Sequence, residues 1–208
     1  MNSVRVKICG LTRPQDVAAA VAAGADAVGF VFVPGSPRYL DTAFAAELVR
    51  QVPAFVSRVG LFLDQDAEWI RRVVQSVPLN LLQFHGTEEA EFCRQFGWPY
   101  IKALSLAAGI AMAEAEAAYP DATALLVDSH EPGGQGGTGR MLDWRRVTAR
   151  NLPLILAGGL NPSNVAAAVS IVHPWAVDVS SGVETAPGIK DANLIRQFIE
   201  EARCGKRK

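Results

Sequence analysis

The 208-residue sequence has a formal net charge of −1 at pH 7, and half of its residues are hydrophobic. This length and composition predict a single globular domain, residues 1–208, that buries a large core without disulfides or metal ions. The near-neutral charge gives no electrostatic basis for binding nucleic acid or an acidic membrane surface. Residues 204–208 carry the basic end of the sequence, and we expect them to form a flexible tail.

Cysteine usage and hydropathy predict the cellular compartment. No apolar run reaches membrane-spanning length, and the first residues lack the basic-then-apolar order of a signal peptide. The three cysteines, Cys9, Cys93 and Cys204, form neither a CxxC pair nor a disulfide framework. We therefore expect a cytoplasmic protein in a reducing environment.

Short apolar runs alternate with segments of helical periodicity along the whole chain. We expect strands over residues 4–9, 27–33, 56–63, 79–85, 100–104, 124–128, 154–157 and 176–180. We expect helices over residues 14–23, 42–51, 67–75, 88–96, 107–118, 144–150, 162–169 and 191–202. Eight β-then-α units of about 26 residues predict a closed (β/α)8 TIM barrel with parallel strands, whose active site lies at the C-terminal face of the strands. An open doubly wound sheet is the alternative, but it usually has fewer strands and a glycine fingerprint after the first one.

Cys9 follows the first predicted strand, where ligands meet the chain in parallel α/β folds. Thr12 and Gln15 have the spacing of a capping box, which predicts that a helix begins there. A lone cysteine is more often a small buried hydrophobic residue than a functional one. Cys9 alone therefore decides nothing.

Polar side chains also follow the second and fourth predicted strands. Arg38 ends a stiff, proline-containing loop, either as a solvated cation or as a planar fork for a carboxylate. Gln83 and His85 lie two residues apart, so they face the same side of their strand. Both could equally be ordinary polar residues at a strand end.

Asp128 ends the sixth predicted strand, as a residue at the mouth of a core or as the start of a turn. The glycine-rich segment 131–140 follows it. Gly134 and Gly139 have the separation found in a phosphate-binding P-loop, but Arg140-Met141 stands where a P-loop has Lys-Ser/Thr. A mobile lid is the better interpretation of this segment.

Glycines and serines follow the last two predicted strands. Gly158 and Gly159 come after the seventh strand, and Ser180 and Ser181 come at the end of the eighth. This pair of adjacent loops matches the standard phosphate site of TIM barrels, although each alone could be an ordinary turn. Asn161-Pro162 predicts a capped helix start beside the site.

These motifs together resemble the phosphoribosylanthranilate isomerase family of tryptophan biosynthesis. The resemblance covers nearly the whole chain, through Lys-Ile-Cys-Gly, Ser-Pro-Arg-Tyr, Leu-Gln-Phe-His-Gly, Val-Asp, Gly-Gly-Thr-Gly, Ala-Gly-Gly-Leu and Asp-Val-Ser-Ser-Gly-Val-Glu. It implies an Amadori rearrangement of a small phosphorylated substrate, without cofactor or metal, by a monomer or homodimer. The chain departs from the family's commoner Lys-Thr-Phe at Arg140, Met141 and Leu142.

The resemblance also implies roles for individual residues. Cys9 is the expected general base and Asp128 the expected general acid. The expected substrate-binding residues are Arg38 for the anthranilate carboxylate and, elsewhere in the pocket and phosphate site, Gln83, Gly158, Gly159, Asp178, Ser180 and Ser181.

Both catalytic groups need altered pKa values, because a free cysteine titrates near ~8.5 and a free aspartate near ~3.9. An apolar pocket and the anionic substrate would raise the pKa of Asp128. Lys7 faces the same side of the first strand as Cys9. The first and eighth strands are neighbours in a closed barrel, which could bring Lys7 against Asp178 and favour the Cys9 thiolate.

Three other functions remain possible from the residues alone. A sugar-phosphate epimerase would need metal-binding histidines, and His85, His130 and His173 form no evident cluster. An indole-glycerol-phosphate synthase-like lyase would need a lysine and glutamate set, for which only Lys102 and Glu184 are candidates. A non-catalytic phosphate-binding module would have no need for both an acid and a base.

Overall fold

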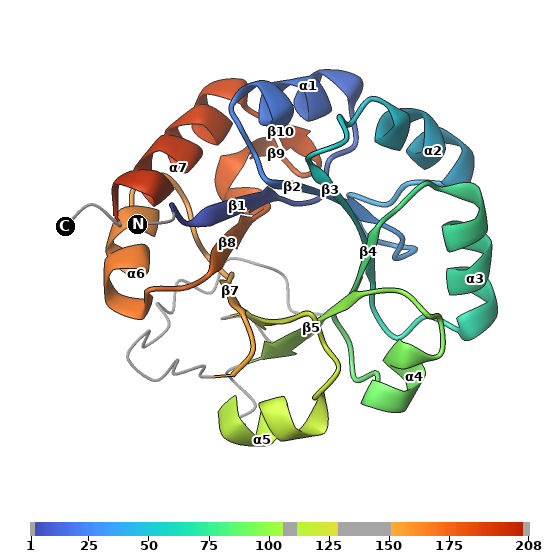
Figure 1. Ribbon diagram of the computed structural model, residues 1–208. Helices are drawn as coiled ribbons and strands as arrows, with labels where there is room; N and C mark the ends of the chain where they lie inside the picture. The colour runs from blue at the N-terminus through green and yellow to red at the C-terminus, as the bar shows by residue number, and fades with distance from the viewer. Residues whose placement is uncertain (1–2, 106–111, 129–150, 206–208) are drawn as a thin grey trace.

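The computed structural model describes residues 3–105, 112–128 and 151–205. Its eight parallel strands form a closed barrel in chain order, with β1 beside β8, and helices surround the barrel (Figure 1). The strands are β1 (Arg5–Ile8), β2 (Ala27–Val31), β3 (Ser57–Phe62), β4 (Leu81–Phe84), β5 (Tyr100–Ser105), β6 (Ala124–Asp128), β7 (Leu154–Leu156) and β8 (Ala176–Val179). The predicted TIM barrel is therefore confirmed, and an open sheet is excluded.

The helices follow the predicted order. They are α1 (Pro14–Ala22), α2 (Thr42–Arg50), α3 (Ala67–Ser76), α4 (Ala90–Arg94), α5 (Met112–Ala118), α6 (Val165–Val172) and α7 (Ala192–Cys204). The helix α4 is shorter than the predicted 88–96, because Glu88 leaves the helix and turns its side chain toward Lys102. The helix predicted over 144–150, and residues 107–111 of the fifth, lie outside the described residues.

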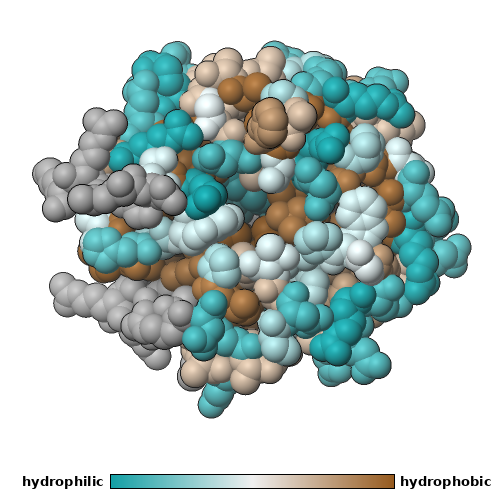
Figure 2. Space-filling view, viewed as in Figure 1, coloured by the Kyte–Doolittle hydropathy of each residue, from teal (hydrophilic) through white to brown (hydrophobic). Residues whose placement is uncertain are grey.

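Two apolar clusters lie on opposite sides of the strands. The larger one includes Phe30 and Leu125 and fills the space between barrel and helices. The smaller one includes Leu126 and Ile155 and fills the barrel itself. Neighbours such as Leu125 and Leu126 enter different clusters because successive side chains of a strand point to opposite faces. On the face shown in Figure 2, hydrophilic side chains dominate the periphery, and hydrophobic ones lie nearer the middle.

The predicted cap of α1 and the predicted start of α6 are both wrong, although α1 begins at Pro14 as predicted. The N-cap of α1 is Arg13, without a side-chain cap, and the hydroxyl of Thr12 instead donates to the carbonyl of Gly188. The helix α6 begins at Val165, three residues later than predicted. Asn161 closes a turn before it, because its Oδ1 accepts a hydrogen bond from the backbone N–H of Ser163 at 2.9 Å. In both places, tertiary contacts or a local turn replace the expected cap.

A small hairpin follows β8 that the sequence pattern did not predict. After the 3₁₀ turn η3 (Ser181–Val183), the strands β9 (Glu184–Ala186) and β10 (Ile189–Lys190) pair antiparallel. The backbone N–H of Lys190 donates to Asp16 of α1 at 3.2 Å, which ties the hairpin to the barrel. This attachment places the side chains of β9 and β10 beside the end of β1.

The C-terminal helix α7 packs on α6. Cys204 is its last residue, and the carbonyl of the buried Gly205 accepts a hydrogen bond from Ser170 Oγ at 2.8 Å. Within the described residues, no helix is both long enough and apolar enough to cross a membrane.

Candidate active site

Side-chain alternation directs the predicted site residues into the barrel. Residues two apart on a strand face the same side. Asp178 follows Ala176 in this way, and Asp128 follows Leu126, and both of these apolar residues belong to the cluster inside the barrel. By the same rule, the side chain of Gln83 on β4 points into the barrel, and it is completely buried. The C-terminal mouth of the barrel is therefore lined by polar groups above an apolar floor.

Cys9 follows β1 directly and is buried. Beside it, Lys7 Nζ donates to Asp178 Oδ1 at 2.9 Å, which confirms the predicted contact between the first and eighth strands. Gly29 of β2 makes room for this arrangement. A Cβ atom at this glycine would lie 2.8 Å from Cys9 Sγ and 3.2 Å from Lys7 Cε, too close for an ordinary contact.

Burial and the neighbouring cation act on Cys9 in opposite directions. Burial raises the pKa of the Cys9 thiol, and the Lys7 ammonium opposes this rise without cancelling it. Burial alone would lower the pKa of Lys7, but Asp178 and Cys9 outweigh it and leave the Lys7 pKa raised. At neutral pH Lys7 is therefore charged, and Cys9 is mainly a thiol. The expectation that Lys7 favours thiolate is right in direction, but burial is the larger effect.

Arg38 lies across the end of β1, in an ionic network with the hairpin. Its Nε and Nη2 donate to the two carboxylate oxygens of Glu184, at 2.8 and 2.6 Å. Lys190 Nζ donates to Glu184 Oε1 at 2.7 Å and to Ser180 Oγ at 3.3 Å. The Arg38 side chain requires glycine at position 10, because a Cβ atom there would collide with Arg38 Cδ. The guanidinium predicted to bind a substrate carboxylate thus already holds a carboxylate of the chain itself.

The opposite side of the mouth, formed by β4, β5 and β6, has fewer charges. His85 Nε2 lies 3.6 Å from Asp128 Oδ2, and His85 Nδ1 lies 3.1 Å from Gln83 Nε2. Gln83 Oε1 and Ser105 Oγ are buried without a hydrogen-bond partner among the described residues. Unpartnered buried polar atoms are rare in folded proteins, so these two indicate where a ligand or solvent binds.

The two loops of the predicted phosphate site touch each other. Gly158 and Gly159 both have positive φ, 82° and 65°, a conformation that favours glycine. Gly182 packs so tightly on the carbonyl of Leu160 that a Cβ atom would collide with it. The backbone N–H groups of Gly159 and Ser181 donate no hydrogen bond to any described residue. Free amide donors on two adjacent loops suit a phosphate.

Lys102 lies outside the barrel, so it cannot serve the catalytic set that the lyase alternative needs. Its Nζ donates to Glu88 Oε2 at 2.8 Å and to the carbonyl of Gly86 at 2.6 Å, and it lies 5.7 Å from the ring of Tyr119. Glu88 in turn accepts from the backbone N–H of Asp64 at 2.8 Å. These bonds join the loops that follow β3 and β4.

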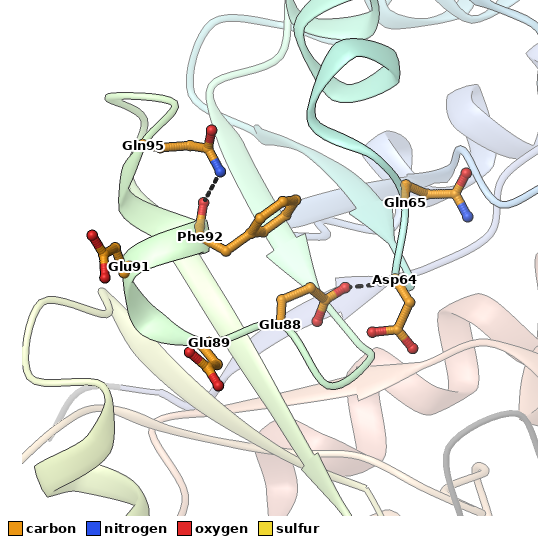
Figure 3. A pocket seen from close by; sticks show the side chains of 7 residues that line it. All are labelled: Asp64, Gln65, Glu88, Glu89, Glu91, Phe92 and Gln95. Atoms are coloured by element: carbon orange, nitrogen blue, oxygen red, sulfur yellow. Dashed lines mark hydrogen bonds between the residues drawn. The ribbon is translucent and has the colours of Figure 1, made fainter.

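A pocket of about 650 Å³ opens near those two loops, but its charge is wrong for a phosphorylated substrate (Figure 3). The residues that line it are Asp64, Gln65, Glu88, Glu89, Glu91, Phe92 and Gln95. Four of these carry carboxylates, which repel an anionic ligand. The candidate site is therefore the barrel mouth.

Sequence reasoning missed three residues at the mouth. Gly29 could have been found, because a glycine inside a strand often marks a close approach of another group. Lys190 gave no signal, since its position depends on the unpredicted hairpin. Glu184 entered only as the last residue of a quoted motif and as a possible residue of the lyase set, without a role at the mouth. The predicted lid over 131–140 and His130 lie outside the described residues.

Comparison with known proteins identifies the family. Residues 6–201 match the family model described as N-(5'phosphoribosyl)anthranilate (PRA) isomerase. The N-(5'-phosphoribosyl)anthranilate isomerase of Thiobacillus denitrificans is 52% identical over 204 residues, which cover 97% of this chain and 99% of the relative. The chain belongs to the phosphoribosylanthranilate isomerase family.

Solved structures of the family agree with the fold. The isomerase from Thermotoga maritima has a TM-score of 0.85 at 41% identity, covering 96% of this chain and 98% of its own. Another isomerase, in complex with reduced 1-(o-carboxyphenylamino)-1-deoxyribulose 5-phosphate, has a TM-score of 0.79 at 40% identity with the same coverage. Membership of this family makes the chain an isomerase of tryptophan biosynthesis, which rejects the epimerase, lyase and binding-module alternatives.

Proposed function

We propose that this isomerase converts N-(5′-phosphoribosyl)anthranilate into 1-(2-carboxyphenylamino)-1-deoxyribulose 5-phosphate, with Asp128 as general acid and Cys9 as general base. The observation that carries the assignment is their placement. Cys9 directly follows β1 and Asp128 ends β6, so both lie at the same end of one barrel. The strands β7 and β8 separate them, which leaves room for the sugar between the two groups.

The first step opens the ribose ring. Asp128, in its protonated form, gives its proton to the ring oxygen while the anilino nitrogen donates its electron pair, so the C1′–O bond breaks and a Schiff base forms. His85 Nε2 lies 3.6 Å from the Asp128 carboxylate and is placed to stabilise the charge left on it.

The second step moves a proton from carbon. The Cys9 thiolate removes the proton of C2′, and the electron pair flows to the Schiff-base nitrogen to give an enolamine, which tautomerises to the ketone. Because burial raises the pKa of Cys9, the thiolate is a minor form, and the nearby Lys7 ammonium is the group that supports it. Asp178 keeps Lys7 fixed through their 2.9 Å ion pair and acts on the substrate site in this way.

Two anionic ends of the substrate need anchors. We assign the phosphate to the loops around Gly159 and Ser181, with Gly158 and Ser180 shaping them, and the anthranilate carboxylate to Arg38. Gln83 faces the sugar between them, since its buried Oε1 has no hydrogen-bond partner in the described ranges. Two anchors at opposite ends of the ligand fix the reacting carbons relative to the acid and the base.

The loss of anthranilate fluorescence on turnover tests the function directly. Purified wild-type protein given N-(5′-phosphoribosyl)anthranilate should consume it without added metal or cofactor, and chelator should not change the rate. An epimerase would leave the fluorescence unchanged, and a binding module would show saturation without turnover. Either result would contradict the proposal.

Assembly and location are proposals of the same kind. We place the protein in the cytoplasm, since Cys9, Cys93 and Cys204 are all free thiols. The net charge of −1 supports no nucleic-acid partner. The Thermotoga maritima relative is dimeric, and for this chain a monomer and a homodimer are both compatible with one active site per barrel. Light scattering of the purified protein distinguishes them.

A further inference from the structure

The network around Arg38 leaves one part of the guanidinium for a ligand. Glu184 takes both Nε and Nη2 of Arg38, in the bidentate geometry that orients a guanidinium most strongly. Among the described residues, Nη1 makes no hydrogen bond. The Arg38 side chain is 22% exposed, while that of Glu184 is only 5% exposed. The carboxylate is thus the buried partner of this pair, and the arginine is the partner that a ligand can reach.

We propose that Glu184 is a positioning residue that determines specificity for a substrate carboxylate, by holding Arg38 so that its Nη1 side faces the ligand. The inference rests on the proposed function, because Arg38 is assigned there to the anthranilate carboxylate. It adds a residue from the hairpin to the recognition of that group.

Glu184 is held too firmly to be displaced by the substrate. The completely buried Lys190 Nζ donates to Glu184 Oε1 at 2.7 Å and to the carbonyl of Ser180 at 3.0 Å. Burial alone would raise the pKa of Glu184, but its bonds to Arg38 and Lys190 outweigh burial and lower it, so the carboxylate stays ionised. Moving Glu184 away would leave a buried lysine without its counter-ion, which is costly.

The charge of the network matches a monoanionic ligand group. Arg38 and Lys190 contribute two positive charges, and Glu184 contributes one negative charge. Lys7 and Asp178, beside them, cancel each other. The network as a whole therefore has a net charge of +1, which complements one carboxylate. The Arg38 side chain also packs against Gly10, so closely that a Cβ atom at this glycine would collide with Arg38 Cδ.

Binding of two matched ligands tests the inference by calorimetry. One is reduced 1-(2-carboxyphenylamino)-1-deoxyribulose 5-phosphate, and the other is the same compound without the ring carboxyl group. For Glu184→Gln we expect Kd to rise about tenfold for the carboxylate ligand, the scale of one charged hydrogen bond, and less than about twofold for the other. For Arg38→Met we expect the Kd of the carboxylate ligand to rise at least about tenfold, and the Kd of the other ligand to stay nearly unchanged.

The control is Glu200→Gln, which removes the same charge from an exposed ion pair on α7 and should leave both Kd values unchanged. An equal rise in the Kd of both ligands in Glu184→Gln would show a merely structural role. Tighter binding of the carboxylate ligand would show that Glu184 competes with that ligand for Arg38. Either overturns the inference, as does no change. If Arg38→Met does not discriminate between the ligands, the assignment of Arg38 itself fails.

A second variant keeps the test valid if Glu184→Gln does not fold, as judged by circular dichroism. Glu184→Asp keeps the charge but shortens the side chain, so it cannot reach both Arg38 and Lys190 as before. We expect it to raise the Kd of the carboxylate ligand about threefold to tenfold, without a matching rise for the other ligand. Unchanged selectivity in a folded Glu184→Asp would also overturn the inference.

Discussion

The two sides of the barrel mouth differ in how completely their polar and charged groups are paired. Near the C-terminal ends of β1 and β8, a fixed array of paired charges surrounds Cys9, and it consists of Lys7, Asp178, Arg38, Glu184 and Lys190. At β4 to β6, buried oxygens of Gln83 and Ser105 have no partner within the described part of the chain, and His85 Nε2 lies 3.6 Å from Asp128 Oδ2. The first side is preorganised before any ligand binds, whereas the second has polar atoms still available to one. The fixed charges lie beside Cys9, the proposed base that removes a proton from carbon. The available polar atoms lie beside Asp128, the proposed acid that protonates an oxygen atom.

Removing either catalytic group should give the largest effect, since each side then loses its reactive atom. Cys9→Ser and Asp128→Asn should each lower kcat by about 100-fold to 10,000-fold, the usual range for a general base or acid. Steady-state turnover of N-(5′-phosphoribosyl)anthranilate measures this. Near wild-type kcat in Cys9→Ser would remove the cysteine as the base.

Breaking the Lys7–Asp178 pair should affect both stability and titration. Lys7→Met leaves a buried carboxylate without its partner, so the free energy of unfolding should fall by about 3–5 kcal/mol in urea titrations. The Cys9 pKa, already raised by burial, should rise further, because the cation that favours the thiolate is gone. Thiolate absorbance, taken as the difference from the same protein with Cys9→Ser, reports this pKa.

The double variant Lys7→Met with Asp178→Leu provides the control for stability. It removes both charges and should recover most of the lost free energy of unfolding, because no unpaired charge remains. An unshifted Cys9 titration in Lys7→Met would show that Lys7 does not act on the thiol.

Filling the space beside Cys9 should give a smaller effect on the same side. In Gly29→Ala the new methyl carbon would lie 2.8 Å from Sγ, so the thiol must move. We expect kcat to fall about tenfold to 100-fold, the scale of a displacement of about 1 Å in a catalytic group. If Gly29 acts through the thiol, adding Gly29→Ala to Cys9→Ser should lower kcat no further. Additive losses would show an independent effect on the fold.

The smallest effect should come from an ion pair far from the mouth. Arg196 and Glu200 form an exposed contact of 3.2 Å one turn apart on α7. Arg196→Ala should change the free energy of unfolding by no more than about 0.5 kcal/mol, because solvent and salt screen such pairs. Its kcat should match wild type, and a clear loss of activity would show that charges outside the mouth also contribute.

Local patterns were sufficient for the barrel and for most of the mouth. The alternation of apolar runs with helical segments predicted all eight strands, since each strand must be buried and each helix must cover it. The placement of Cys9 and Asp128 at one face was predicted because strand ends in a parallel barrel meet there, whereas their roles came from the family resemblance. The start of α1 at Pro14 was predicted correctly, but its cap was not, because Thr12 bonds to Gly188, a residue distant in sequence.

The sequence by itself determined the closed barrel, the family and the order of the strand-end residues, because these depend on periodicity and on short motifs. Only the tertiary structure decided the partners of the charged groups. Arg38 binds Glu184, Lys190 is buried against Ser180, and the pKa of Cys9 is raised despite Lys7. Burial and contacts between residues distant in sequence set the balance of charge and desolvation, and no local pattern contains that balance.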